Sequence, residues 1–206
     1  MKPTVRRRAP RGQGEQLHAE ILTAAAGLLT ETGREDDVSI RAVAERVGVT
    51  PPSIYLHFPD KGSLLDAVVV EAFTDLHEAM AEAGRSSDDV TVALAAQGRA
   101  YIAFARARPE HYRLMFMRRP GPDLEMPTEA EITAVAGLST VIDTLRRGQQ
   151  RGVIPLDEDP VRVALTLWAA VHGIAALLIA KPHFPWGDEE DLIERVIAMS
   201  LRGISR

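Results

Sequence analysis

The chain contains no cysteine among its 206 residues. This absence excludes disulfide bonds, thiolate catalysis and zinc sites with sulfur ligands, and it fits a reducing compartment. Catalytic and cofactor motifs are also lacking: no HExxH, P-loop, GxGxxG or GxSxG string occurs, and the histidines are scattered. The basic N-terminus has no apolar stretch behind it and is not a secretory signal. We therefore expect a cytoplasmic protein that is not an enzyme and has no metal site and no cofactor.

The chain also lacks any sustained alternation of apolar and polar residues, whereas helical spacing of apolar residues runs through nearly all of it. We expect an all-α fold of about nine helices, three or four in a small N-terminal unit and five in a larger bundle. Residues 118–127, rich in proline and glycine, are expected to form a loop. The expected helices cover approximately residues 15–32, 40–47, 51–58, 61–84, 89–107, 111–117, 128–152, 160–180 and 188–201.

Capping residues mark where these helices begin and end. Glycine in the left-handed conformation commonly ends a helix, and this is the role expected of Gly33 and Gly48. Pro51 and Pro52 are tolerated in a first helical turn, because the N–H groups there have no intrahelical partner. Helix starts are expected at Ser39, Thr50, Asp60 and Asp159, and at Thr128 with Glu131 as a capping box.

The net charge of −5 is unevenly distributed. Residues 1–62 hold nine Lys and Arg against eight Asp and Glu, and the remainder holds fifteen against twenty-one. An acidic body would be repelled by phosphates and would turn a basic end toward them. The arginines near the N-terminus form either a solvated tail or an arm that orders on a DNA groove, and both can hold. This cluster consists of Arg6, Arg7, Arg8 and Arg11.

Residues 39–58 contain two short helices that meet at Gly48, an arrangement that fits the DNA major groove. Most apolar side chains here are expected in the core, which leaves the N-terminal end of the second helix to face DNA. Tyr55 can bond a phosphate oxygen and Lys61 can neutralise one. The second helix has no Arg, Asn or Gln, so base reading is sparse and DNA shape contributes. The other candidates for contact are Thr50, Pro51, Pro52, Ser53 and His57.

These residues resemble the DNA-binding domain of the tetracycline-repressor (TetR) family. The most specific match is the string I-Y-x-H-F-x-D-K at residues 54–61. The resemblance implies phosphate contacts from Thr50, Tyr55, His57 and Lys61, and a groove role for residues 51–53. Pro51-Pro52 and Leu56 depart from the family pattern, which leaves the operator sequence open. The other matching residues are Ile21, Ala25, Leu28, Gly33, Ser39, Ile40, Ala44, Gly48, Val49, Leu64 and Leu65, and Ser39 joins the expected DNA-contacting residues.

The C-terminal part resembles the TetR class named for a Trp-His-Gly motif, through Trp168, His172 and Gly173 and the run at residues 111–116. One interpretation is that Trp168 and His172 are ordinary core residues on one helix face. The other is an apolar pocket for a small molecule with a few polar groups. The expected lining of that pocket is Tyr101, Phe104, Tyr112, Met115, Phe116, Trp168 and His172.

Residues 164–180 are almost wholly apolar, but this length is short for a membrane span. Burial on both sides explains such a helix better. The resemblance implies that the last two helices pair with a second subunit in a four-helix bundle. An aqueous homodimer without a membrane is therefore expected.

Together these observations predict three segments: a basic flexible arm at residues 1–14, a helix-turn-helix DNA-binding domain at 15–62, and an effector-binding and dimerisation domain at 63–206. The predicted protein is a transcriptional regulator, a repressor that leaves a pseudo-palindromic double-stranded DNA operator when a small apolar effector binds. The alternative is a family member that has lost specific DNA reading and acts through protein contacts.

Overall fold

The computed structural model describes residues 14–117, 137–155 and 157–204. Within these residues the protein forms nine α-helices and one turn of 3-10 helix, without any strand, which confirms the predicted all-α fold. The described chain separates into two compact units. The first holds residues 14–72 and 110–117, and the second holds residues 73–109, 137–155 and 157–204.

The first unit is built from short helices around one apolar core. In it α1 packs against α2 and the 3-10 turn, and α2 packs against α3. Ile21, Val43 and Ile54 are fully buried, and burial of each side chain contributes up to about 1.5–3 kcal/mol. The elements are α1 (Gly14–Thr32), η1 (Glu35–Asp37), α2 (Ile40–Val47), α3 (Pro51–Tyr55), the beginning of α4 (Lys61–Arg85) and α6 (Pro109–Phe116).

The helix ends in this unit follow the predicted capping residues in most places. Gly33 and Gly48 adopt the left-handed φ values of 75° and 78°, which favour glycine. The Ser39 hydroxyl accepts a hydrogen bond from the Ala42 N–H at 3.1 Å. At the start of α4, Asp60 accepts one from the Ser63 N–H at 2.7 Å.

One capping prediction was correct in position but not in its hydrogen bond. Thr50 occupies the N-cap position of α3, but its side chain makes no capping bond and its hydroxyl lies 3.1 Å from that of Ser53. The reason is that Pro52 has no N–H, while the Ser53 N–H already donates to the Thr50 carbonyl at 2.9 Å. Residues 34–37, which fall between two of the expected helices, include the 3-10 turn η1.

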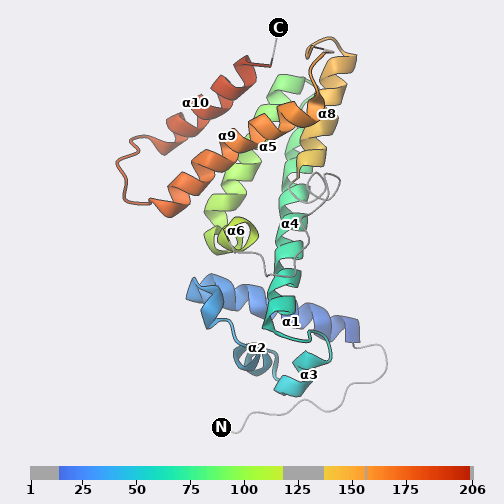
Figure 1. Ribbon diagram of the computed structural model, residues 1–206, viewed down its shortest axis with the longest axis vertical. Helices are drawn as coiled ribbons and strands as arrows, with labels where there is room; N and C mark the ends of the chain where they lie inside the picture. The colour runs from blue at the N-terminus through green and yellow to red at the C-terminus, as the bar shows by residue number, and fades with distance from the viewer. Residues whose placement is uncertain (1–13, 118–136, 156, 205–206) are drawn as a thin grey trace. The chain divides into compact units, whose positions relative to one another are not determined.

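The second unit is a bundle in which α5 packs against α8, α9 and α10, and α9 packs against α8 and α10. Figure 1 shows α9 (orange) and α10 (red) side by side, joined by the loop at 181–188. An aspartate side chain caps the start of each of three helices: Asp89 for α5, Asp159 for α9 and Asp188 for α10. The elements are the end of α4, α5 (Val90–Ala107), α8 (Leu138–Gln150), α9 (Pro160–Ala180) and α10 (Glu189–Arg202). The predicted loop at 118–127 and the capping box of Thr128 and Glu131 lie outside the described residues.

Helix α9 alone, among the described residues, is long and apolar enough to cross a membrane by length and composition. A core helix of a soluble protein passes the same test, so this observation is weak evidence for a span. In the single chain, 39% of its most apolar window is buried, and Leu165 and Leu177 are among the exposed large apolar side chains. The helix therefore keeps an apolar surface that the chain itself does not cover.

Candidate DNA-binding surface and apolar cavity

The exposed end of α3 is the surface that the sequence predicts for DNA contact. Residues 50–52 are exposed and Ser53 is half-buried. Ile54, in the same short helix, is fully buried and anchors α3 in the core. Tyr55 is 52% exposed, so its ring stands at the protein surface. The helix thus presents its first turn and Tyr55 outward, which is the presentation that a groove contact requires.

Three further predicted DNA contacts are also engaged within the protein. Ser39 caps α2, and the ring centroid of His57 lies 5.9 Å from that of His18 on α1. The Lys61 ammonium donates to the Asp36 carbonyl at 3.2 Å. An ammonium has three donors, so Lys61 retains others for a phosphate oxygen.

Leu56, directly after α3, is 85% exposed. Sequence reasoning noted this position as a departure from the family pattern but did not expect an apolar side chain so open to solvent. Arg6, Arg7, Arg8 and Arg11 lie outside the described residues.

An apolar cavity of about 30 Å³ lies inside the second unit. Tyr101 and Trp168, both predicted to line a pocket, are in its wall. The remaining wall comes from five helices, and none of its residues was predicted to line a pocket. The helical spacing of Leu94, Gly98 and Tyr101 could have suggested one shared face on α5. The other residues of the wall are Met80, Leu138, Val141, Ala164, Leu167, Val171, Ile197, Ser200 and Leu201.

The Tyr101 hydroxyl connects two residues of α9. Trp168 Nε1, which can only donate, lies 3.2 Å from the hydroxyl oxygen. His172 Nδ1 lies 2.9 Å from the same oxygen. Burial lowers the pKa of His172 below its ordinary value, which favours the neutral ring. In the neutral tautomer that carries its proton on Nε2, His172 Nδ1 accepts a hydrogen bond from the Tyr101 hydroxyl.

The other predicted pocket residues lie elsewhere. Phe104 is 9% exposed and is outside the cavity wall, with the Arg108 guanidinium 5.3 Å from its ring centroid. Tyr112, Met115 and Phe116 are on α6, in the first unit. There the Tyr112 and Phe116 rings pack at 4.9 Å.

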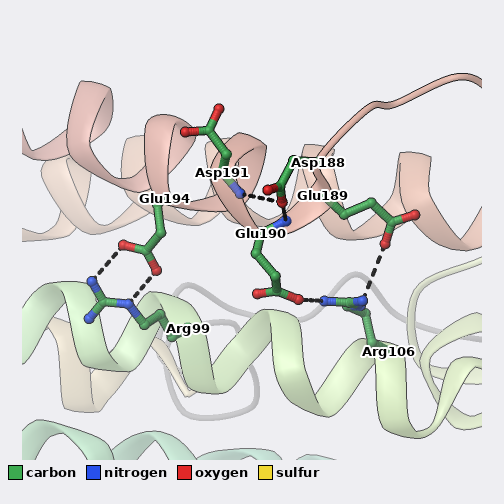
Figure 2. A network of polar contacts seen from close by, with 7 residues as sticks. All are labelled: Arg99, Arg106, Asp188, Glu189, Glu190, Asp191 and Glu194. Atoms are coloured by element: carbon green, nitrogen blue, oxygen red, sulfur yellow. Dashed lines mark hydrogen bonds and ion pairs between the residues drawn. The ribbon is translucent and has the colours of Figure 1, made fainter.

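Two arginines of α5 bind carboxylates of α10, as Figure 2 shows. Arg99 donates to both oxygens of Glu194, through Nε at 2.5 Å and Nη2 at 2.7 Å. This bond holds the pKa of Glu194 below its ordinary value. Arg106 pairs with Glu190 and, at 3.2 Å, with Glu189. These long-range ion pairs fasten α10 along α5.

Metal ligation has no candidate in the described part of the chain, where no group of three or more His, Asp and Glu could hold an ion. The polar groups of the cavity wall are few, and no acid, base and nucleophile converge there among the described residues. The arrangement suits the binding of a molecule more than its chemical conversion.

Comparison with known proteins gives two matches that together span both units. Residues 21–68 match the family of bacterial regulatory proteins named tetR, and residues 94–200 match the tetracyclin repressor-like C-terminal domain. The tetracycline repressor protein class A from transposon 1721 of Escherichia coli is 33% identical over 106 residues, which are 51% of this chain and 48% of that protein. The chain thus spans about half the length of this relative.

Solved structures share the fold over nearly the whole chain. A protein of unknown function from Rhodococcus sp. RHA1 has a TM-score of 0.78 and 26% identity, covering 97% of this chain and 100% of that one. FadR of Bacillus subtilis, solved in complex with stearoyl-CoA, has a TM-score of 0.72 over 91% of this chain and 99% of its own. Its identity of 18% shows the fold alone. From the two family matches, the chain belongs to the tetR family of bacterial regulatory proteins, which are DNA-binding transcription regulators and not enzymes.

Proposed function

We propose that this protein is a homodimeric, ligand-responsive repressor in the cytoplasm. It binds a pseudo-palindromic operator through two copies of α3 and leaves it when a small apolar molecule enters the C-terminal bundle. The observation that carries the proposal is that one chain combines an outward-facing α3 with an apolar cavity in a separate compact unit. The proposed boundaries are a basic arm at 1–14, a DNA-binding domain at 15–62 and an effector domain at 63–206.

On the DNA side, phosphate contacts supply most of the affinity. Tyr55 and Lys61 meet phosphates, joined by Thr50 and His57, while residues 51–53 lie in the major groove. The arginines of the N-terminal arm add contacts in the adjacent groove. Because α3 has no Arg, Asn or Gln, much of the selectivity comes from DNA shape.

On the effector side, the size of the cavity determines how binding acts. About 30 Å³ has room for little more than a water molecule, whereas small-molecule sites usually measure about 300–1,000 Å³. An effector must therefore part the helices around the cavity. Met80 in the cavity wall belongs to α4, whose other end follows α3. Displacement of α4 changes the spacing of the two recognition helices, provided that the effector binds the displaced form more tightly.

The apolar character of the effector has support from the cavity wall and from a relative in fold. Nearly all the wall residues are apolar. The B. subtilis FadR structure contains stearoyl-CoA, a ligand with a long alkyl chain. Tyr101 and Trp168 of the cavity wall, with His172 beside them, are the proposed polar contacts. Phe104, Tyr112, Met115 and Phe116 lie outside this cavity wall and are not part of the proposed site.

Dimerisation through α9 and α10 accounts for the apolar surface on those helices. Leu165 and Leu177 of α9 are 38% and 48% exposed, and Met199 of α10 is 66% exposed. Ala169, also exposed on α9, permits a close approach of a second helix. An aqueous dimer buries these side chains without a membrane.

The test is to titrate the protein against DNA from upstream of its own gene. Fluorescence anisotropy measures the binding at several salt concentrations. A fragment of that region should compete far better than random DNA, and octanol should release it. If no fragment binds better than random DNA, the repressor proposal fails. The alternative, action through protein contacts, is favoured by the 85% exposure of Leu56, and it predicts that outcome.

A further inference from the structure

A second hollow, an open groove of about 470 Å³, lies between α5 and α10. Its volume falls in the range of small-molecule sites, unlike that of the apolar cavity. It differs from the cavity in character as well, because charged side chains stand along it. The lining residues are Thr91, Ala95, Arg99, Glu194, Ile197, Ala198, Leu201 and Arg202.

The groove and the apolar cavity share a wall. Ile197 and Leu201 of α10 line both, and they are only 4% and 7% exposed. On α5, Gly98 lines the cavity while its neighbour Arg99 lines the groove. Two apolar side chains therefore separate a roomy, charged groove from a small, apolar space.

The charges of the groove favour an anion. Arg99 and Arg202 contribute two positive charges and Glu194 one negative charge. Arg202 makes no ion pair with any residue that the structure describes. Arg99 donates through Nε and Nη2 to the Glu194 carboxylate (Figure 2), and each of these two side chains is 49% exposed. Because both side chains are half-exposed, another anion can reach Arg99 and compete with Glu194 for it.

We propose that the groove and the cavity are two parts of one site for an amphipathic anion. Its alkyl chain passes Ile197 and Leu201 into the apolar cavity, and its carboxylate or phosphate head takes the place of Glu194 on Arg99. This inference rests on the proposed function and names the effector class: an acyl chain with an anionic head. The guanidinium recognises either head by paired hydrogen bonds.

When the head of the ligand replaces Glu194 on Arg99, α10 is also held less firmly against α5. The ligand breaks the ion pair between Arg99 and Glu194, whereas the ion pairs of Arg106 with Glu189 and Glu190 remain (Figure 2). Ile197 and Leu201 can then move apart from α5, and this movement enlarges the cavity for the chain of the ligand.

Intrinsic fluorescence of Trp168, which lines the cavity, can report binding. A Trp186→Phe background removes the second tryptophan while keeping a ring against Phe184. The probes are octanoate, octyl phosphate and octanol, which share one alkyl chain. Octanoate should bind roughly tenfold more tightly than octanol. Comparison of octyl phosphate with octanoate distinguishes a phosphate head from a carboxylate head. Equal affinities indicate a general anion site, and a higher affinity for one probe identifies the preferred head group.

The variants give effects of opposite sign. Arg99→Gln should weaken octanoate binding roughly tenfold without weakening octanol binding, because octanol has no anionic head. Glu194→Gln should strengthen octanoate binding severalfold, because Arg99 loses its internal partner. Glu190→Gln is the matched control. It removes one of the two ion pairs that join Arg106 to α10, outside the groove, and should leave the ratio of octanoate affinity to octanol affinity unchanged.

Several outcomes would overturn the anion site. Weakening of octanoate by both Arg99→Gln and Glu194→Gln would show that the pair only holds α10 in place. Equal affinities for octanoate, octyl phosphate and octanol would exclude head-group recognition but leave an apolar effector. Absence of binding by all the probes would reject the site. The operator titration judges the DNA-binding part of the proposed function independently of these results.

Discussion

The hydroxyl oxygen of Tyr101 lies 2.9 Å from Nδ1 of His172, although 71 positions separate these residues in the chain. Trp168 Nε1 donates to the same oxygen at 3.2 Å. One fully buried hydroxyl on α5 thus joins two side chains of α9 beside the apolar cavity. We expect this arrangement to contribute to the stability of the bundle and to its response to pH.

Replacing Tyr101 by Phe removes the oxygen that Trp168 and His172 both use. We expect the free energy of unfolding to fall by about 1–2 kcal/mol, the usual cost of losing buried hydrogen bonds. Urea denaturation at fixed protein concentration measures it. Tyr55→Phe is the matched control, because Tyr55 is 52% exposed and its loss should leave stability unchanged. Equal stability of both variants would contradict the role of the Tyr101 hydroxyl.

The stability of the protein should fall as the pH drops below the ordinary pKa of histidine, near 6.5. Burial lowers the pKa of His172, so between the two values the unfolded chain binds a proton that the folded chain does not. The contribution of His172 is complete above the unfolded pKa and is lost as pH falls through the folded pKa. Unfolding by urea across this range should show a shallower decline for His172→Gln. Parallel pH profiles for the variant and the wild type would show that His172 does not cause the loss of stability at low pH.

Replacing Gly148 by Ala should destabilise the bundle. A Cβ there would lie 2.5 Å from Ile154 Cγ1 and 2.9 Å from Val90 Cγ1, and such overpacking costs about 1–3 kcal/mol. Gly98→Ala, also within a helix, is the control, since its Cβ would meet Val171 Cγ1 at an ordinary 3.4 Å. That change should be neutral or stabilise by up to about 1 kcal/mol. Thermal unfolding of both variants compares them, and a stabilised Gly148→Ala protein would be the contrary result.

Tyr55→Phe should weaken binding to operator and random DNA by a similar factor. The phenolic hydroxyl is expected to contact a phosphate, which carries no sequence information, and its loss costs about 1 kcal/mol. Fluorescence anisotropy with both DNAs measures the two affinities. A loss confined to the operator would indicate instead that Tyr55 reads bases.

Deletion of residues 1–11 should flatten the dependence of DNA affinity on salt. The deleted segment includes Arg6, Arg7, Arg8 and Arg11, and each phosphate that such a side chain neutralises contributes roughly −0.9 to the logarithmic slope. Affinities at several salt concentrations give the slope. An unchanged slope would mean that the arm does not contact DNA.

Much of the local structure could be predicted from the chain because its causes lie within a few residues. Gly33 and Gly48 end their helices in the left-handed conformation, and Asp159 caps α9, as their positions suggest. Thr50 is the instructive exception. Its capping bond is missing because Pro52, two positions on, offers no N–H, a local cause that the residue type at position 50 did not reveal.

The apolar cavity was harder to predict because its wall depends on which helix faces meet. Tyr101 and Trp168 line the cavity, but Tyr112 on α6 belongs to the other compact unit. Periodicity marks all of them as buried and does not distinguish one core from another. The ion pair between Arg99 and Glu194 could not be predicted from the sequence, because 95 positions separate the two residues.

By itself, the sequence determined that this is a helical protein with an outward-facing recognition helix and a family-specific string at residues 54–61. Those properties follow from backbone hydrogen bonds, helix caps and apolar spacing, all of which act over one or two turns. Only the tertiary structure decided that Tyr101 bonds His172, that Ile197 separates a cavity from a groove, and that Arg99 holds a carboxylate at its edge. The reason is that these relationships arise when α5, α9 and α10 pack together, and packing joins faces that no local pattern connects.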